Sequence, residues 1–249
     1  MKRLLPLFIT LVMFILINGK VLSQTDSVEN NNYSFEVEST FSSKYVWRGI
    51  IYNEGLVFQP AITVNKDNWG AQIWSNLPLH DLNQETYQKE IDFYLWYNLQ
   101  LGELTISPTI MYYTYPGQDA NSTGEIGFSL FYPIDNFDLS SSVNMDFKEI
   151  GGAFSFQHDI TYNNSLNDNL DLSIMASVGW ADKKFNNYYI GIEKVAVNYF
   201  QTNISLKYML SENISLKPFV ENYRILDSAI SEIIKNNFFN MGITFNLEI

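Results

Sequence analysis

The stretch EIDFYLWYNLQL, residues 90–101, decides the fold class. Its alternate residues fall into an apolar set, Ile91, Phe93, Leu95, Tyr97, Leu99 and Leu101, and a polar or amphipathic set, Glu90, Asp92, Tyr94, Trp96, Asn98 and Gln100. Because successive side chains of a strand point to opposite faces, the stretch predicts a strand with one apolar face. That face must contact either a protein core or lipid, and the rest of the chain has to decide between them.

The same alternation recurs along the chain, and no long window after residue 32 has helical periodicity. The pattern predicts an all-β domain of about twelve strands. The expected segments are 33–50, 56–65, 69–77, 88–101, 103–115, 123–132, 137–148, 152–162, 169–181, 195–210, 213–225 and 237–249.

The connections between these segments alternate in length. Those after even-numbered strands are mostly short, as at 65–68 and 102–103, whereas those after odd-numbered strands are often longer, as at 182–194 and 226–236. The connections near 51–55 and 149–151 are short exceptions. Such alternation is typical of an up-and-down antiparallel barrel with short periplasmic turns and longer external loops. Both termini are then expected in the periplasm.

The first residues have the pattern of a secretory signal. Lys2 and Arg3 precede an apolar run, and a short polar stretch follows, with cleavage expected after Ser23. The alternative is a transmembrane helix, for which the run is short. We therefore expect a signal peptide at 1–23, a flexible leader at 24–32 and the barrel at 33–249.

Composition favours lipid over a second protein layer around the barrel. Aromatic residues make up 16% of the chain, the polar faces carry few lysines, and there is no cysteine. A soluble β-sandwich would normally expose more charges of both signs. A strand meander in hydrocarbon must close to satisfy its backbone groups. We therefore predict a single antiparallel transmembrane β-barrel in the bacterial outer membrane, in contact with its lipid.

The C-terminal segment adds an expected partner. The sequence NMGITFNLEI, residues 240–249, resembles the C-terminal assembly signal of outer-membrane barrels, although it ends in Ile249 rather than Phe. This resemblance implies recognition by the barrel-assembly machinery. The formal charge of −12 argues against nucleic acid as a partner, because phosphate binding needs Lys and Arg.

Three stretches resemble the TorF family of porins. They are SSKYVWRGI (42–50), QPAITVNKDNWGAQIWSN (59–76) and EIDFYLWYNLQLGELTISPTIMYYTYPG (90–117), in the same order and spacing as in that family. The similarity covers about residues 40–132. It implies an outer-membrane barrel, and it says more about location and fold than about substrate.

The polar faces supply the candidate pore-lining residues. They are Glu36, Glu38, Lys44, Arg48, Glu90, Asp92, Glu125, Asp146, Lys148, Asp159, Lys207 and Glu221. An excess of carboxylates would favour cations in a pore. Alternatively, acids and bases on neighbouring strands pair and fill the interior. Arg48 is expected either to clamp Glu90 or Asp92, or to bind an anionic solute.

These observations predict a porin-like channel for passive diffusion of small polar solutes, with a preference for cations. One alternative is a non-conducting barrel with a structural role or a loop-mediated binding role. An outer-membrane enzyme is disfavoured, because the lipid-facing His158 has Phe156 and Ile160 at the nearest positions on its own face and no serine. We expect no catalytic residue, metal ligand or cofactor, since no matching spacing or glycine loop is found.

Overall fold

The computed structural model describes residues 33–79 and 88–249. The expected signal peptide (1–23) and leader (24–32) lie outside the described residues. The strands are β1 (Tyr33–Trp47), β2 (Ile50–Lys66), β3 (Trp69–Pro78), β4 (Glu90–Tyr97), β5 (Leu99–Leu101), β6 (Leu104–Thr114), β7 (Thr123–Ile134), β8 (Phe137–Asp146), β9 (Phe154–Asn167), β10 (Leu170–Ala181), β11 (Ala196–Ser211), β12 (Ile214–Ile225) and β13 (Asn237–Glu248). Two helices, α2 (Lys183–Tyr189) and α3 (Ser228–Ser231), lie in connections.

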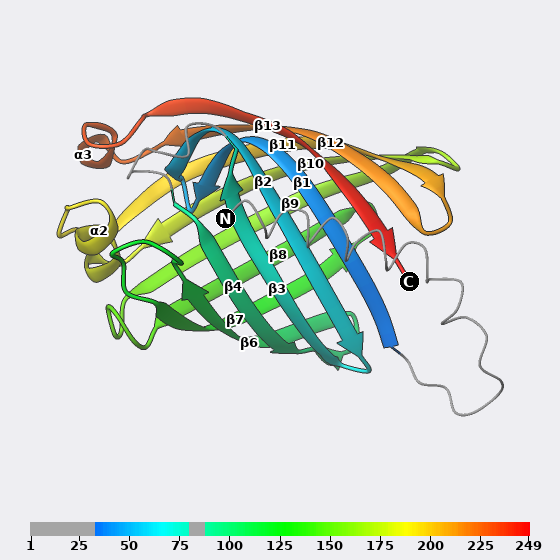
Figure 1. The fold of residues 1–249 in the computed structure, drawn as a ribbon, viewed down its shortest axis with the longest axis horizontal. Coiled ribbons are helices and arrows are strands. Elements are labelled where there is room, and N and C mark those ends of the chain that lie inside the picture. Colours follow the sequence, from blue (N-terminus) through cyan, green and yellow to red (C-terminus); the bar gives the residue numbers. More distant parts are fainter. Residues whose placement is uncertain (1–32, 80–87) are drawn as a thin grey trace.

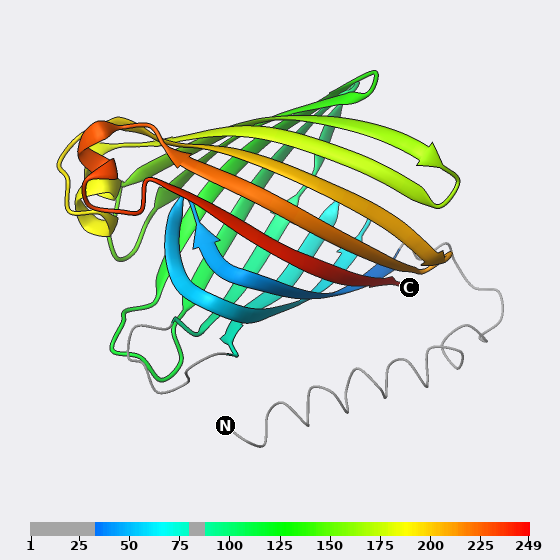
Figure 2. The same cartoon turned by 90° about the horizontal axis from the view of Figure 1, so that it is seen from above.

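The strands form one closed antiparallel barrel (Figures 1 and 2). The sheet has 13 strand segments, but β4 and β5 are one strand interrupted at Asn98, and both pair with β6. The wall therefore consists of twelve strands when β4 and β5 are counted as one, and β1 closes it by pairing with β13. The all-β barrel of twelve strands predicted from the alternation is confirmed.

The two ends of the barrel differ. At the turn end, two-residue turns join β2 to β3, β5 to β6, β7 to β8, β9 to β10 and β11 to β12. Asp67, Gly102 and Asp135 adopt positive φ angles of 52°, 64° and 51° in these turns. The longer connections, with α2 and α3, lie at the opposite, loop end, and the C-terminus lies at the turn end (Figure 2).

Some connections differ from the sequence prediction. The link from β1 to β2 is a two-residue hairpin at Arg48 and Gly49, with φ angles of 51° and 80°, as in type I′ turns. The strand expected to end at residue 162 continues to Asn167, which shortens the following turn. Helices α2 and α3 were not predicted, because each has only 7 or 4 residues. Both begin at an N-cap aspartate, Asp182 and Asp227.

The outer face of the barrel is apolar. Among its exposed large side chains are Phe93, Leu95, Ile110, Phe128, Leu130, Ile160, Ile174, Ile204, Val220, Phe239, Met241 and Phe245. In water, an apolar belt of this extent would be a strong association surface, whereas hydrocarbon covers it at no cost. Neither described helix has the length and hydropathy to cross a bilayer.

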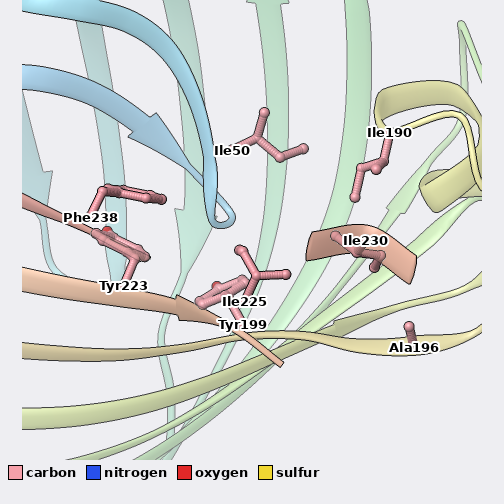
Figure 3. Packing of buried hydrophobic residues seen from close by; sticks show 8 residues of the cluster. All are labelled: Ile50, Ile190, Ala196, Tyr199, Tyr223, Ile225, Ile230 and Phe238. Atoms are coloured by element: carbon pink, nitrogen blue, oxygen red, sulfur yellow. The ribbon is translucent and has the colours of Figure 1, made fainter. Parts of the chain in front are cut away.

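Among the described residues, the interior is mostly polar along its length, and its apolar core lies at the loop end. There, the side chains of Ile50, Ile190, Tyr199, Ile225 and Ile230 pack together with Ala196, Tyr223 and Phe238 (Figure 3). They come from the β1–β2 hairpin, from the connections that carry α2 and α3, and from β11, β12 and β13. This core lies inside the mouth of the barrel.

Candidate functional site in the barrel lumen

The end of β1 turns its side chains into the lumen. The pairing of β1 with β2 shifts register between Ser42 and Lys44, and again between Tyr45 and Val46. The hydroxyls of Ser42 and Ser43 both donate to Asn240 Oδ1, at 2.8 and 2.9 Å, and hold this bulge in place. A bulge adds one residue to one strand and so reverses which face the following side chains occupy.

This bulge changes the orientation of the residues that follow it. Alternation from Phe35 and Val37 would turn Tyr45 outward, but Tyr45 is buried in the lumen, where it lies opposite the buried Asn53. Lys44 was expected in the lumen, but it pairs in register with the exposed Glu54 and therefore belongs to the outer face. A single inserted residue cannot be recognised from alternation alone, since the bulged segment SSKY has no apolar–polar contrast.

Arg48, at the tip of the β1–β2 hairpin, reaches across the lumen to Glu125 on β7. Its guanidinium makes two hydrogen bonds to the carboxylate, at 2.7 and 2.6 Å. The side chains are only 13% and 3% exposed, so the ion pair is buried. Tyr113 also donates to Glu125, at 2.9 Å. The predicted clamp by Arg48 is therefore present, but the expected partners Glu90 and Asp92 are wrong.

Aromatic rings surround this ion pair. Arg48 Cζ lies 4.2 Å from the ring centroid of Trp47. The Trp47 ring contacts Phe185 and Tyr189 of the α2 connection, with centroid distances of 5.6 and 5.1 Å, and Tyr113 of β6 at 6.3 Å. We call Trp47, Arg48, Tyr113, Glu125, Phe185 and Tyr189 the constriction. Its members come from three sides of the lumen, and together with the apolar core they close the loop end.

Tyr199 fixes the hairpin tip against the wall. A Cβ at Gly49 would lie 2.8 Å from the Tyr199 ring, and one at Gly179 would lie 2.1 Å from it. The ring is therefore in close contact with both glycines, and its hydroxyl donates to Gln157 at 2.7 Å. These glycines allow an approach that no other residue permits. Alternation does not reveal this contact, because Tyr199 and the two glycines come from segments far apart in the sequence.

The carboxylates of Glu90 and Asp92 lie in the wall beside the constriction. Both are buried, and they receive hydrogen bonds from Tyr45 at 2.7 Å and from Tyr94 at 3.0 Å, respectively. Asp92 Oδ1 has no hydrogen-bond partner among the described residues. These acids thus face inward as predicted, but they are enclosed by tyrosines rather than open to a water path.

Asp146 is the last residue of β8, and Lys148 lies in the connection between β8 and β9. Asp146 accepts from the backbone N–H groups of Lys148 and Ile150, at 2.8 and 3.0 Å, and from the hydroxyl of Thr123. Lys148 instead directs its ammonium to Tyr112 and Ser122, at 2.8 and 2.5 Å, on the exposed side. Placing Lys148 in the lumen is wrong, because the strand ends at Asp146 and alternation no longer applies.

The remaining candidates lie on inward positions of the barrel wall. Asp159 accepts from Ser140 and Gln157, at 2.7 and 2.9 Å. Glu221 accepts from Gln201, Asn203 and Asn240, at 3.0, 3.1 and 2.9 Å.

Nearer the turn end lie Glu36, Glu38 and Lys207. Lys207 is paired in register with Asp171, and Glu36 with Thr63 of β2. Glu38 lines a cavity that it shares with Lys217. These three acids and bases are therefore close to the open part of the lumen.

The open part of the lumen lies at the turn end. One cavity of about 900 Å³ is lined by Asp135, Asn136, Thr161, Asn163, Asn164, Ser165, Asp171, Ser173, Met175, Asn203, Ser205, Lys207 and Lys217. A second cavity of about 280 Å³ shares Asn203, Ser205 and Lys217 with it. We call the two together the vestibule. Beside Arg48, by contrast, the space amounts to only about 20 Å³.

His158 lies exposed on the outer face, where simple alternation puts it, and is not turned inward by a bulge; a serine of the neighbouring strand lies beside it. Ser141 Oγ lies 2.9 Å from His158 Nδ1, and the indole N–H of Trp180 donates to Nε2 at 3.2 Å. Because Nε2 accepts from Trp180, the neutral ring carries its proton on Nδ1 and donates to Ser141. In this tautomer His158 cannot take the serine proton, which is the step a hydrolase needs.

The fold is similar to those of bacterial outer-membrane porins and channels. The NanC porin aligns with a TM-score of 0.55 and 10% identity, covering 86% of this chain and 98% of that one. The KdgM porin gives 0.53 and 12%, covering 85% and 98%. The COG4313 outer membrane channel from Pseudomonas putida F1 gives 0.50 and 9%, covering 91% and 100%. These likenesses concern the fold alone.

Sequence comparisons add the family. No curated protein sequence matches the chain. The TorF resemblance of residues 40–132 is not confirmed, because the family model that matches has another description. The sequence model described as "MltA-interacting protein MipA" matches residues 51–245. This range covers most of the barrel, and the chain therefore belongs to the MipA family.

Proposed function

We propose that this outer-membrane barrel is a porin-like channel for small polar solutes whose resting state is closed at the constriction. The observation that carries the proposal is the polar vestibule of about 900 Å³ inside a closed barrel. A barrel that served only as a scaffold would need no such space, since a barrel of twelve strands can be filled with side chains.

Passage through the barrel requires movement of only a few groups. Trp47, Tyr113 and Glu125 of the constriction belong to wall strands, whereas Arg48 lies in the β1–β2 hairpin turn and Phe185 and Tyr189 belong to α2. The groups that can move are therefore the hairpin tip and the connection that carries α2. Loops of this kind move on microsecond to second timescales without unfolding the barrel. Separating Arg48 from Glu125 and withdrawing α2 would join the vestibule to the loop end.

The inward charges support a preference for cations. The acids on inward positions are Glu36, Glu38, Glu90, Asp92, Glu125, Asp138, Asp146, Asp159, Asp171 and Glu221. With Lys44 and Lys148 on the outside, the bases that remain are Arg48, Lys207 and Lys217. The excess of carboxylates is therefore larger than the sequence alone predicted. Rings of acidic side chains attract cations and repel anions in a pore.

Bilayer conductance tests this proposal directly. Purified protein reconstituted in a planar bilayer with a KCl gradient should give channel openings, with a reversal potential that favours K⁺ over Cl⁻. Changing Glu38 and Glu221 to Gln should reduce this preference, whereas changing Glu54, on the outer face, should not. A barrel that remains folded but never conducts, and that releases no sugar or amino acid from liposomes, would contradict the channel.

A non-conducting binding role is the second candidate. The buried ion pair and the apolar core at the loop end favour it, because they close the lumen. The name of the family describes an MltA-interacting protein, and a protein partner of that kind would engage a surface rather than the lumen. We also infer that β13, through its outward Phe245 and Leu247, is the segment that the barrel-assembly machinery recognises. Exchange of both residues for Ser should reduce the amount of folded barrel in the membrane.

A further inference from the structure

One wall of the vestibule carries a regular array of polar side chains. Because β9 to β12 are in register, Asn163, Ser173 and Ser205 lie in one row across the strands and end at Phe219. The adjacent row towards the constriction consists of Thr161, Met175, Asn203 and Glu221, and the row towards the turns contains Ser165, Asp171 and Lys207. Rows lie about 6.7 Å apart and strands about 4.8 Å apart, so hydrogen-bonding groups cover the wall at close spacing.

Phe219 places an aromatic ring in this polar wall. A Cβ built on its register partner Gly242 would lie 2.5 Å from Phe219 Cζ and 2.7 Å from Cε1, so the ring occupies the space above that glycine. The ring is half-buried and lines the smaller cavity with Ser205 and Lys217. Phe219 is an inward aromatic residue on a mostly polar wall. It is not among the residues of the apolar core, which lies at the loop end, so packing in that core does not explain its position.

Two polar groups close to this ring make no hydrogen bond or ion pair within the part of the chain that the structure describes. They are the hydroxyl of Ser205, the register partner of Phe219, and the ammonium of Lys217, which lines the same cavity. The hydroxyl of Thr161, three strands away on the same wall, is likewise without a hydrogen bond among the described residues. By contrast, Asn203 and Glu221 bond to each other at 3.1 Å. The free groups are therefore available to a ligand without the loss of an existing interaction.

We propose that this wall is a binding site for a neutral saccharide. A sugar ring has an apolar face of C–H groups, which suits Phe219, and an edge of hydroxyl groups, which suits the amides and hydroxyls of the three rows. Lys207 and Lys217 lie among Asp171, Glu38 and Glu221, so the wall carries charges of both signs and presents no cluster of bases that would hold an anionic sugar. This inference needs one part of the proposed function, namely that solutes can enter the vestibule from the turn end.

Equilibrium binding to the full barrel tests the site. Titration calorimetry of protein in a detergent without a sugar head group would use maltotriose and cellotriose as neutral probes, with uridine as a planar aromatic probe. We expect at least one trisaccharide to bind. Phe219→Ala should weaken its binding about tenfold, which corresponds to the loss of one aromatic contact. Phe219→Trp should retain binding, and Phe239→Ala, at an outward position of the adjacent strand, should leave it unchanged.

The outcomes separate the site from the channel. Ser205→Ala removes one hydroxyl without disturbing the fold and should weaken binding about fivefold, so the test does not depend on whether Phe219→Ala folds. Three results would overturn the saccharide site. Neither trisaccharide binds, or Phe219→Ala and Ser205→Ala bind a trisaccharide as tightly as the unchanged protein does, or uridine alone binds. Conductance without trisaccharide binding would refute this inference only, whereas binding without conductance would refute the channel only.

Discussion

Removing the charge of Glu125 should open the barrel. The change Glu125→Gln keeps the size of the side chain and an acceptor for Tyr113, but it leaves the guanidinium of Arg48 buried without a counter-charge. Loss of one partner from a buried ion pair costs about 3–5 kcal/mol. Arg48 can avoid this cost if the hairpin tip leaves the lumen.

The expected change is large. Since each 1.4 kcal/mol corresponds to a factor of about ten in an equilibrium constant, the ratio of open to closed barrels should rise by about a hundred- to a few thousand-fold. Single-channel recording in planar bilayers measures this ratio as open probability. Folding of each variant is checked by the change in its electrophoretic mobility on heating.

Two further variants make the test specific. Glu54 also forms an ion pair, with Lys235 at 3.0 Å, but their side chains are 61% and 53% exposed. Because exposed pairs contribute less than about 1 kcal/mol, Glu54→Gln should leave the open probability unchanged. The double change of Arg48 to Met and Glu125 to Leu replaces the buried charges by apolar groups and should restore closure. If Glu125→Gln folds and its open probability equals that of the unchanged protein, the constriction is not the gate.

Three other predictions concern separate parts of the chain. Gly179→Ala should lower the free energy of unfolding by about 1–3 kcal/mol, because its Cβ would lie 2.1 Å from the Tyr199 ring. The control Gly151→Ala, whose nearest contact is at 4.0 Å, should change the urea midpoint of unfolding little. Equal midpoints for the two variants would refute the close packing. A hydrogen bond from Lys194 lowers the pKa of Asp227 below its ordinary value of 3.8, so the cap on Ala229 and Ile230 should be complete above that pH and be lost as the pH falls further, seen as faster exchange of these two amides; Asp227→Asn should keep the cap and lose the pH dependence. Cleavage after Ser23 should give a mature protein whose measured mass is that of a chain beginning at Gln24. An intact N-terminus in membrane fractions would show that no signal peptide is removed.

The fold could be predicted because it depends on a pattern that every strand repeats. The segment 239–249 alternates without exception, and the structure places Phe239, Met241 and Phe245 on the exposed face as expected. The number of strands and the two unlike ends follow from the same pattern and from the lengths of the connections. These features rest on local alternation, which a sequence records completely.

The site could be predicted only in part, because it depends on contacts between distant segments. The inward orientation of Glu90 and Asp92 follows from alternation, but the partner of Arg48 lies 77 positions away on β7. The orientation of Tyr45 and Trp47 depends on one bulged residue, Ser43, which changes the face without changing composition. The short helix α2, which supplies Phe185 to the constriction, is too short to produce a helical period.

The seam between β1 and β13 has a consequence for biogenesis. Thr40 and Thr244 meet there through their hydroxyls although they are 204 positions apart. In a chain that emerges N-terminus first, β1 would come among the first strands and its second neighbour, β13, last, so one edge of β1 would stay unpaired until the end. Such an edge is a template for mispairing with other nascent chains. We therefore expect that loss of the twelve residues of β13 would leave the facing edges of β1 and β12 unpaired and prevent closure of the barrel.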